Sequence, residues 1–316
     1  MRPKSGPFKS LTCVLGVDVG KAQVVIFDSH SRRTIKVDNT AEALEAALTG
    51  FCDYELMVCE ATGGHERVLL EVAVGLGLPA HRADALRVKR YIASLGGAAK
   101  TDGIDAAWLA RYGQERGAEL ARWSAGSAEQ DELACLVRYR RRLVDARTET
   151  KNRRAAPLCR PIAPMLDDEL AFLAEQIRRI DVAIAELSAR HAALAERLRR
   201  LRRLTGFGPV VATTVLALMP ELGTMSRRQA ASLAGLAPHP RDSGTLRPRR
   251  RTGPGRSDLK PLLFMAALAA VKTDPRWKAF AERLTLAGKS KRLILTAVAR
   301  NLVVIANSQL RQPALT

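Results

Sequence analysis

The stretch LGVDVGKAQVVIFDS, residues 15–29, places one carboxylate in the middle of an otherwise apolar run. Apolar residues over 14–19 predict a short buried strand, Gly20 marks a turn, and residues 24–27 predict a second strand. Burying Asp18 in such a strand is costly unless the carboxylate has a partner, and metal ions are the usual partners of clustered carboxylates. The stretch therefore predicts two adjoining strands with a functional acid at the end of the first.

The sequence from residue 12 to about 115 alternates short apolar strands with helical stretches. Three strands in succession, joined by short turns, predict an antiparallel meander, and later strands that alternate with helices predict parallel additions to the same sheet. Asn39 or Thr40 is the expected N-cap of the first helix. The expected strands are 13–19, 22–28, 33–38, 54–60 and 80–84, and the first expected helix is 39–51.

The charge of the chain indicates a polyanionic partner. The 316 residues include 51 Lys and Arg against 32 Asp and Glu, a formal net charge of +19. Nucleic acid is the first candidate partner and an anionic membrane the second. The opening residues 1–13 lack the apolar core of a signal peptide, and the apolar runs at 210–219 and 261–271 are too short to span a bilayer. We therefore expect no membrane association and a place in the cytoplasm or nucleoid.

The five cysteines form no C-x-x-C pair and show no matching histidine spacing. Neither a zinc site nor a disulfide framework is expected.

Residues from about 129 to 204 have the pattern of a helical coiled-coil connector. Apolar residues recur at alternating three- and four-residue steps from Leu170 to Leu201, with His191 as a register-setting polar residue in the seam. The preceding segment 130–154 is also helical in pattern, and the proline-containing stretch 157–164 separates the two. An antiparallel helical hairpin able to dimerise is the expected arrangement.

The last part of the chain opens with an apolar helix after a glycine-containing turn. The turn TGFGP, residues 205–209, predicts either a helix-hairpin-helix whose backbone amides hold a DNA phosphate or a simple capped helix joint. Residues 239–260, rich in Pro, Gly and Arg, are expected to form a loop or a short ribbon.

Three further acids resemble Asp18 in their placement. Glu60 ends the strand 54–60, and Asp102 and Asp105 are three residues apart, so that both project from one face if the segment is helical. Four such acids could hold two divalent ions for phosphoryl transfer, and Mg²⁺, with Mn²⁺ as a substitute, suits an all-oxygen site. Alternatively, Asp102 only caps a helix and Glu60 is an ordinary surface acid.

The motif GVDVGK also resembles the first phosphate loop of the actin and sugar-kinase ATPases. That fold needs further glycine-rich phosphate and adenosine loops, and none follows a comparable strand here.

Six motifs together make the chain resemble the DEDD insertion-sequence transposases, which include the Piv-like DNA invertases and the bridge-RNA-guided recombinases. They are GVDVGK, CEATGG, KTDGIDA, LTGFGPVVA, ASLAGLAPHPRDSGT and RTGPGRSDLKPLLFMAAL, in this order. The resemblance implies an α/β RNase H-like, RuvC-type domain over 1–125, a coiled-coil hairpin over 126–204, and a mostly α C-terminal transposase domain with a helix-hairpin-helix over 205–316.

The resemblance also implies the site residues. Asp18, Glu60, Asp102 and Asp105 correspond to the metal-binding tetrad, and Ser243 to a nucleophilic serine. Many relatives carry two serines before the glycine, and here Asp242 occupies the first position. Without the resemblance, Ser243 would only begin a turn, and Ser232 and Ser257 would be equal candidates. The basic residues expected to bind nucleic acid are Arg241, Arg247, Arg249, Arg250, Arg251, Arg256 and Lys260.

These expectations describe a DNA recombinase of an insertion sequence. The family implies a composite site in a homo-oligomer, a dimer or tetramer assembled by the coiled coil, and a noncoding guide RNA that selects the DNA. Two alternatives stay open: a RuvC-like hydrolytic nuclease on branched DNA in which Ser243 is idle, and a non-enzymatic DNA-binding protein.

Overall fold

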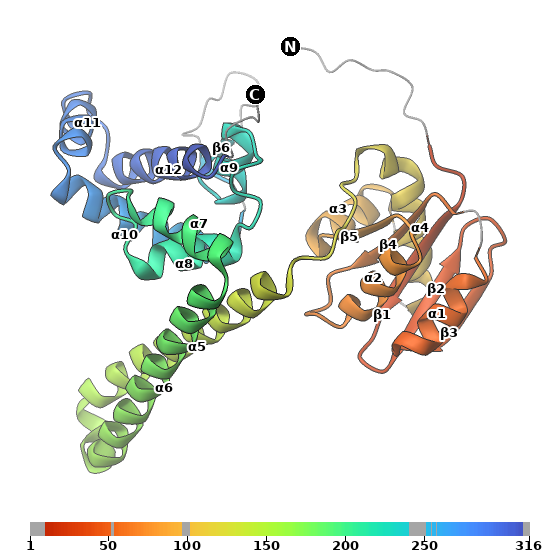
Figure 1. The fold of residues 1–316 in the computed structure, drawn as a ribbon, viewed down its shortest axis with the longest axis horizontal. Coiled ribbons are helices and arrows are strands. Elements are labelled where there is room, and N and C mark those ends of the chain that lie inside the picture. Colours follow the sequence, from red (N-terminus) through yellow and green to blue (C-terminus); the bar gives the residue numbers. More distant parts are fainter. Residues whose placement is uncertain are drawn as a thin grey trace. The chain divides into compact units, whose positions relative to one another are not determined.

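A computed structural model describes residues 10–51, 54–96, 102–239, 251–253, 255–256 and 258–311, and of residues 102–104, 239 and 251 the backbone only. The chain divides into two compact units, Met1–Gly126 and Ser127–Thr316. Figure 1 shows the sheet in the first unit and the many helices of the second.

The first unit is built on a five-stranded mixed sheet. Its strand order is β3-β2-β1-β4-β5, in which β1, β2 and β3 pair antiparallel, and β4 and β5 are added parallel to β1. The expected antiparallel meander with parallel additions is confirmed. The strands are β1 (Val14–Val19), β2 (Gln23–Asp28), β3 (Thr34–Asp38), β4 (Leu56–Glu60) and β5 (Ala80–Ala83).

Helices cover both faces of this sheet. Leu15 and Val17 face a core that includes Leu44 of α1 and Leu69 of α2, whereas Val58 faces a second core with residues of α3 and α4. Thr40, one of the two expected N-caps, accepts the backbone N–H of Ala43 at 3.3 Å. The helices are α1 (Ala41–Thr49), α2 (Glu66–Gly75), α3 (Ala85–Ser94) and α4 (Asp102–Arg116), followed by the 3-10 turn Gly117–Glu119.

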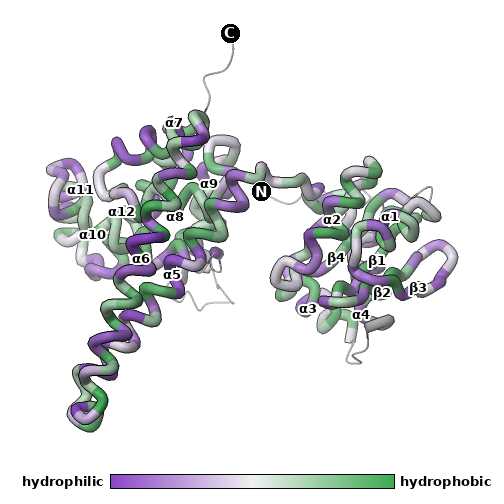
Figure 2. The backbone as a smooth tube through the Cα atoms, turned by 60° about the horizontal axis from the view of Figure 1, so that its bottom comes forward, coloured by the Kyte–Doolittle hydropathy of each residue, from purple (hydrophilic) through white to green (hydrophobic). Residues whose placement is uncertain are grey.

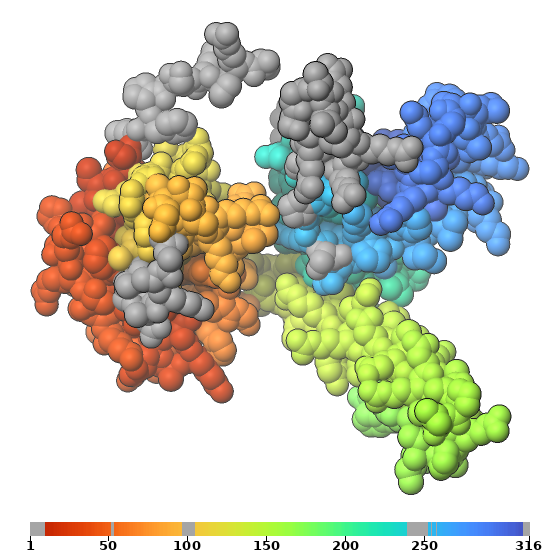
Figure 3. All heavy atoms as spheres, turned by 180° about the vertical axis from the view of Figure 1, so that it is seen from behind, coloured from red at the N-terminus to blue at the C-terminus, as the bar shows by residue number. Residues whose placement is uncertain are grey.

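The second unit begins with a long antiparallel hairpin. Helix α5 (Ala128–Ala155) and helix α6 (Ala163–Arg190) are joined by the 3-10 segment Pro157–Ile162. Cross-helix ion pairs from the base to the tip, Arg190–Glu132, Arg140–Asp181 and Arg154–Asp167, fix the two helices antiparallel. Figure 3 shows the hairpin, in yellow-green, as an arm that extends beyond the rest of its unit.

The expected continuous seam through His191 is wrong, because the helix breaks there. His191 has extended backbone angles, and α7 (Ala192–Arg202) begins as a separate helix. The break serves the packing: Leu173 and Ile177 face α5 in a small core at the arm, whereas Leu194 and Leu201 face the large core of the unit. The same apolar spacing therefore belongs to two helices with different partners.

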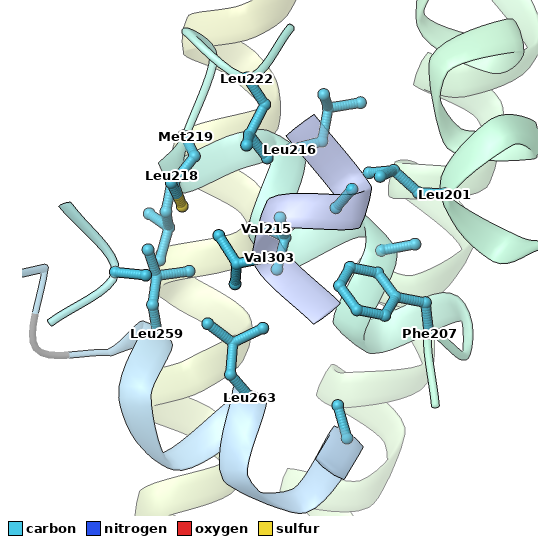
Figure 4. Close-up of a cluster of buried hydrophobic side chains, with 14 of the residues drawn as sticks. Leu201, Phe207, Val215, Leu216, Leu218, Met219, Leu222, Leu259, Leu263 and Val303 are labelled. Atoms are coloured by element: carbon cyan, nitrogen blue, oxygen red, sulfur yellow. The ribbon is translucent and has the colours of Figure 1, made fainter. Parts of the chain in front are cut away.

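The remaining helices pack around the large core, which Figure 4 shows in close-up. Phe207, Leu216 and Val303 lie at its centre and are almost fully buried. Leu133 of α5 and Leu187 of α6 belong to the same core, so the base of the hairpin is part of it. The helices are α8 (Pro209–Leu218), α9 (Arg227–Leu233), α10 (Leu259–Thr273), α11 (Pro275–Leu286) and α12 (Lys291–Gln309), and the strands are β6 (Pro238–His239) and β7 (Arg251–Thr252).

Hydrophilic and hydrophobic residues alternate along the helices of the hairpin in Figure 2, as expected of helices with one buried face. Within the described ranges, no helix combines the length and the apolar character that crossing a membrane requires.

Candidate active site

Asp18 and Glu60 lie side by side at the ends of neighbouring parallel strands. Strands β1 and β4 pair with Val17 opposite Cys59, and Asp18 and Glu60 are the next residues along each strand. Neighbouring strands lie about 4.8 Å apart, and residues at the same level point to the same side of the sheet. The two carboxylates therefore share one face and one level.

The side-chain alternation of the strands shows which face this is. Val17 and Cys59 point into the core under α1 and α2, and Val58, two residues before Glu60, points into the core under α3 and α4. Since successive residues of a strand point to opposite faces, Asp18 and Glu60 point to the face that α4 covers.

Helix α4 lies unusually close to β1 because residue 16 is glycine. A Cβ atom at Gly16 would overlap the carbonyl oxygen of Ala106 and the amide nitrogen of Ala110. Asp105 immediately precedes Ala106, and Gly16 lies two residues before Asp18 on the same face. The close contact therefore brings the third acid, Asp105, to the face that holds the other two.

The electrostatics of Glu60 agree with this placement. Burial raises the pKa of Glu60, and the carboxylates of Asp18, Asp105 and Asp84 raise it further, against the opposing effect of Lys89. Asp84 follows β5 and accepts the backbone N–H of Arg87 at 2.9 Å as the N-cap of α3. The site thus carries negative charge that a bound cation would compensate.

Asp102 is the first residue of α4, three residues before Asp105, as the expected helical spacing requires. Its side chain lies outside the described part of the structure. Among the side chains that are described, no group of three or more His, Cys, Asp or Glu residues lies close enough to form a metal site. The chemistry of the donor set, carboxylates only, fits a hard divalent cation such as Mg²⁺.

Glu66 fixes the loop that follows Glu60, a role that no pattern in the sequence indicated. Its side chain is only 2 % exposed. Its Oε2 atom accepts the N–H and the hydroxyl of Thr62, both at 3.1 Å, and the N–H of Gly64 at 2.8 Å. Arg82 of β5 donates to Oε1 at 2.8 Å. The motif CEATGG is therefore held from inside by a buried acid two residues beyond it.

Asn39 ties the two motif loops of the sheet together. Its Nδ2 donates to the carbonyl oxygen of Gly20, in the loop after Asp18, at 3.0 Å, and to that of His65 at 3.1 Å. The sequence had suggested Asn39 only as a helix cap. Asn39 lies 19 residues from Gly20 and 26 residues from His65 along the chain, so no local sequence pattern indicates these contacts.

Ser243 and its neighbours Arg241, Arg247, Arg249 and Arg250 lie outside the described residues, as does Ser257. The described chain on either side is brought together, since His239 pairs with Arg251 in a two-residue antiparallel ladder. Gly255 lies so close to Gly235 that a Cβ atom at residue 255 would overlap the backbone there. The two ends of the serine segment are thus adjacent.

Arg256 and Lys260, two residues expected to bind nucleic acid, have partners within the unit. The Arg256 guanidinium donates to both carboxylate oxygens of Glu221, at 2.6 and 2.9 Å, and to the carbonyl oxygen of Leu218. The Lys260 ammonium donates to the hydroxyl of Thr252 at 2.5 Å. The side chain of Arg251 lies outside the described residues.

The turn TGFGP joins α7 and α8, as the sequence predicted. Gly206 has a φ of +88°, and a Cβ atom there would overlap the carbonyl oxygen of Ala266. Phe207 anchors the turn in the large core, and Gly208 caps α8, whose first residue is Pro209. Phosphate binding by this turn stays a prediction.

Comparison with known proteins gives two family matches and several relatives. A transposase family of the DEDD, IS110 type matches residues 15–160, and the transposase IS116/IS110/IS902 family matches residues 198–282. Pilin gene-inverting proteins of Moraxella lacunata and Moraxella bovis are each 28 % identical over 264 residues, 81 % of this chain and 80 % of theirs. An uncharacterised 42 kDa protein of insertion element IS900 from Mycobacterium paratuberculosis is 30 % identical over 155 residues, 46 % of this chain and 38 % of its own.

The two family matches follow one another along the chain and take in both groups of expected site residues. The four acids lie in the first match and Ser243 in the second. Together with the relatives, these matches lead to one conclusion: the chain belongs to the IS110-type transposase family.

Proposed function

We propose that the protein is a DNA transposase or site-specific recombinase that exchanges strands through a serine-phosphodiester intermediate, with Asp18, Glu60, Asp102 and Asp105 as the ligands of Mg²⁺ or Mn²⁺. The single observation that carries the proposal is the placement of Asp18, Glu60 and Asp105 on the face of the sheet that α4 covers, where the carboxylates of Asp18 and Asp105 raise the pKa of Glu60. The family of the chain and the inverting activity named for its Moraxella relatives support recombination rather than another phosphoryl transfer.

The four acids would hold divalent cations, which supply positive charge to the scissile phosphate when bound. The rigid mounting of the acids favours this: Asp18 and Glu60 are fixed by strand pairing, and Asp105 by the contact of α4 with Gly16. Glu66 and Asn39 hold the loops that follow the two strand acids.

Ser243 would act as the nucleophile. Its Oγ–H proton passes to a base as the new Oγ–P bond forms, and the bond from phosphorus to one deoxyribose oxygen breaks. That leaving oxygen takes up a proton and becomes a hydroxyl. In the rejoining step such a hydroxyl attacks the phosphorus of another strand that is bound to serine, and the serine Oγ leaves and regains a proton. The nearby arginines, Arg241, Arg247, Arg249, Arg250 and Arg251, would balance phosphate charge and hold the DNA backbone.

We further propose an RNase H-like, RuvC-type assignment for the first unit, consistent with its strand order. The hairpin of α5 and α6 would act as a coiled coil that assembles a homo-oligomer, so that acids and serine from different subunits complete one site. A noncoding RNA would select the DNA, and the protein would act on nucleoid DNA in the cytoplasm. The high positive charge supports polyanion binding in general.

The test is a search for a denaturation-resistant protein–DNA adduct with labelled element-junction DNA, Mg²⁺ and RNA transcribed from the flanking region. Wild type should form the adduct, and Ser243→Ala and Asp18→Ala should not. Ser232→Ala, which removes a serine on α9 of the same unit, is the matched control and should retain it.

Cleaved ends that are equally abundant in Ser243→Ala, with no adduct in wild type, would replace the serine mechanism by that of a hydrolytic nuclease. If the wild type and all variants bind DNA but none cleaves it, the protein is a non-enzymatic DNA-binding protein.

A further inference from the structure

A cavity of about 470 Å³ lies in the second unit between the turn after α7, helix α11 and helix α12. Its volume is within the range of about 300–1,000 Å³ that is usual for small-molecule sites, and its walls are largely apolar with a few polar groups. Figure 1 shows α11 beside α10 and α12 at the edge of the unit. The lining residues include Arg203, Thr205, Arg276, Trp277, Phe280 and Gln309.

Two aromatic side chains form one wall. The rings of Trp277 and Phe280 meet edge to face, with centroids 6.0 Å apart, and the guanidinium of Arg283 lies 5.2 Å from the centroid of Phe280. Aromatic residues make up only 4 % of the chain, and two of them meet at this cavity. Helix α11, which the structure describes throughout, contributes no fully buried residue, so both rings stay partly exposed.

Asp274 holds two of the residues that line the cavity, Thr205 and Arg276. Its carboxylate, 8 % exposed, accepts the hydroxyl of Thr205 at 3.0 Å and two bonds from the Arg276 guanidinium, at 2.9 and 3.2 Å. Arg276 nevertheless remains 85 % exposed. Arg203, in the turn after α7, also lines a second cavity with Arg202, so positive charge continues along the surface of the unit.

We infer that this cavity receives an unpaired nucleobase of a DNA strand, stacked on Trp277 or Phe280, with the flanking phosphates on Arg203 and Arg276. The inference rests on the proposed function, because it adds a site to a protein that acts on DNA. Aromatic faces accept any base, and guanidinium groups at the rim bind the backbone on either side.

The chemistry of the walls favours a nucleotide over other ligands. A purely apolar ligand would not require the exposed arginines, and a phosphate alone would not require the aromatic wall. Gln309 adds an amide with both donors and an acceptor at the cavity, suited to the edge of a base. An unpaired DNA base presents all three features at once: a flat aromatic ring, a hydrogen-bonding edge and an adjacent anionic backbone.

The experiment compares the binding of two fluorescein-labelled DNA strands to the full-length protein by anisotropy. One is oligothymidylate and the other is an abasic deoxyribose-phosphate strand of the same length, which keeps the charge and lacks the bases. Wild type should prefer the base-bearing strand. Trp277→Leu should reduce that preference about tenfold, the order expected for the loss of one base–aromatic stack, with little change for the abasic strand.

Two further variants separate stacking from charge and from helix damage. Arg276→Gln should weaken the binding of both strands equally. It should also lower the slope of the logarithm of the binding constant against the logarithm of the salt concentration by about one. Leu286→Ala removes an exposed apolar residue of the same helix outside the cavity and should change neither affinity. Because Trp277 also packs against the large core, thermal unfolding of Trp277→Leu is measured first.

A fluorescence measurement on the wild-type protein tests the inference even if Trp277→Leu does not fold. Oligothymidylate with one 2-aminopurine should lose fluorescence when bound, as expected of a base stacked on an aromatic ring. Unchanged fluorescence on binding would overturn the inference.

An equal loss of affinity for both strands in Trp277→Leu, or no loss, would overturn the inference as well. A base preference seen for oligouridylate and absent for DNA would assign the cavity to RNA instead. Asp18→Ala and Ser243→Ala should keep the base preference, so a failure of the proposed strand exchange leaves this result unaffected.

Discussion

Gly16 of β1 lies so close to the Ala106 carbonyl oxygen of α4 that no side chain can stand between them. This contact sets the distance of α4 from the sheet and, through it, the position of Asp105 relative to Asp18 and Glu60. The arrangement of the three acids therefore depends on a glycine two residues before the first of them.

Gly16→Ala should destabilise the first unit by about 1–3 kcal/mol, because the added methyl group forces α4 away from β1. Strand exchange should fall more than stability alone explains, since Asp105 moves with the helix. Denaturant unfolding and the adduct assay measure the two effects. Gly75→Ala is the matched control, because a Cβ atom at Gly75 meets nothing within 4 Å. A Gly16→Ala protein of unchanged stability would contradict the close contact.

Divalent cations should raise the thermal unfolding temperature of the wild type and have little effect on Glu60→Gln. The reason is that burial and the neighbouring acids raise the pKa of Glu60 by opposing its negative charge, and a bound cation would compensate that charge. Without added metal, Glu60→Gln should be at least as stable as wild type. Thermal unfolding with Mg²⁺, Mn²⁺ and EDTA tests this, with Glu71→Gln on the outer face of α2 as the control. Equal stabilisation of wild type and Glu60→Gln by Mg²⁺ would exclude Glu60 as a ligand.

Glu66→Gln should destabilise the protein at neutral pH by about 1–3 kcal/mol, because a buried acceptor of several hydrogen bonds loses its charge. Burial acts to raise the pKa of Glu66, but hydrogen bonds from the backbone and the charge of Arg82 outweigh it and hold the pKa below its ordinary value of 4.5. A lowered pKa in the folded state stabilises the protein above the unfolded pKa, and this contribution is lost as the pH falls.

The difference between wild type and Glu66→Gln should therefore be largest near pH 7 and shrink below about pH 4.5. Unfolding by urea at a series of pH values measures it. A difference that is independent of pH would mean that packing, and not the carboxylate charge, stabilises this loop.

Arg256→Gln should lower stability without changing the salt dependence of DNA binding, because its guanidinium is held by Glu221 and Leu218. Both partners of the ion pair are about one third or more exposed, so solvent screening limits their coupling to about 0.5–1 kcal/mol. A double-mutant cycle with Glu221→Gln measures the coupling. A salt slope reduced by about one in Arg256→Gln would instead support the phosphate contact expected from the sequence.

The strand acids were predictable from the sequence because short strands have a simple period. Asp18 and Glu60 each follow an apolar run of fixed length, and Asp105 lies one helical turn from Asp102. The helix break at His191 was not predictable, because the residues around it contain no glycine or proline and the apolar spacing continues unchanged on both sides. There, the packing of α7 against the large core decides the structure.

Local periodicity and short motifs predicted the order of strands and helices, the antiparallel meander with its parallel additions, the hairpin of α5 and α6, and the family of the chain. The folded chain was needed to show which face the acids share, how Gly16 places α4, that Glu66 and Asn39 hold the loops, and that Arg256 is engaged within its unit. These features depend on contacts between residues far apart in the chain, which no local pattern records.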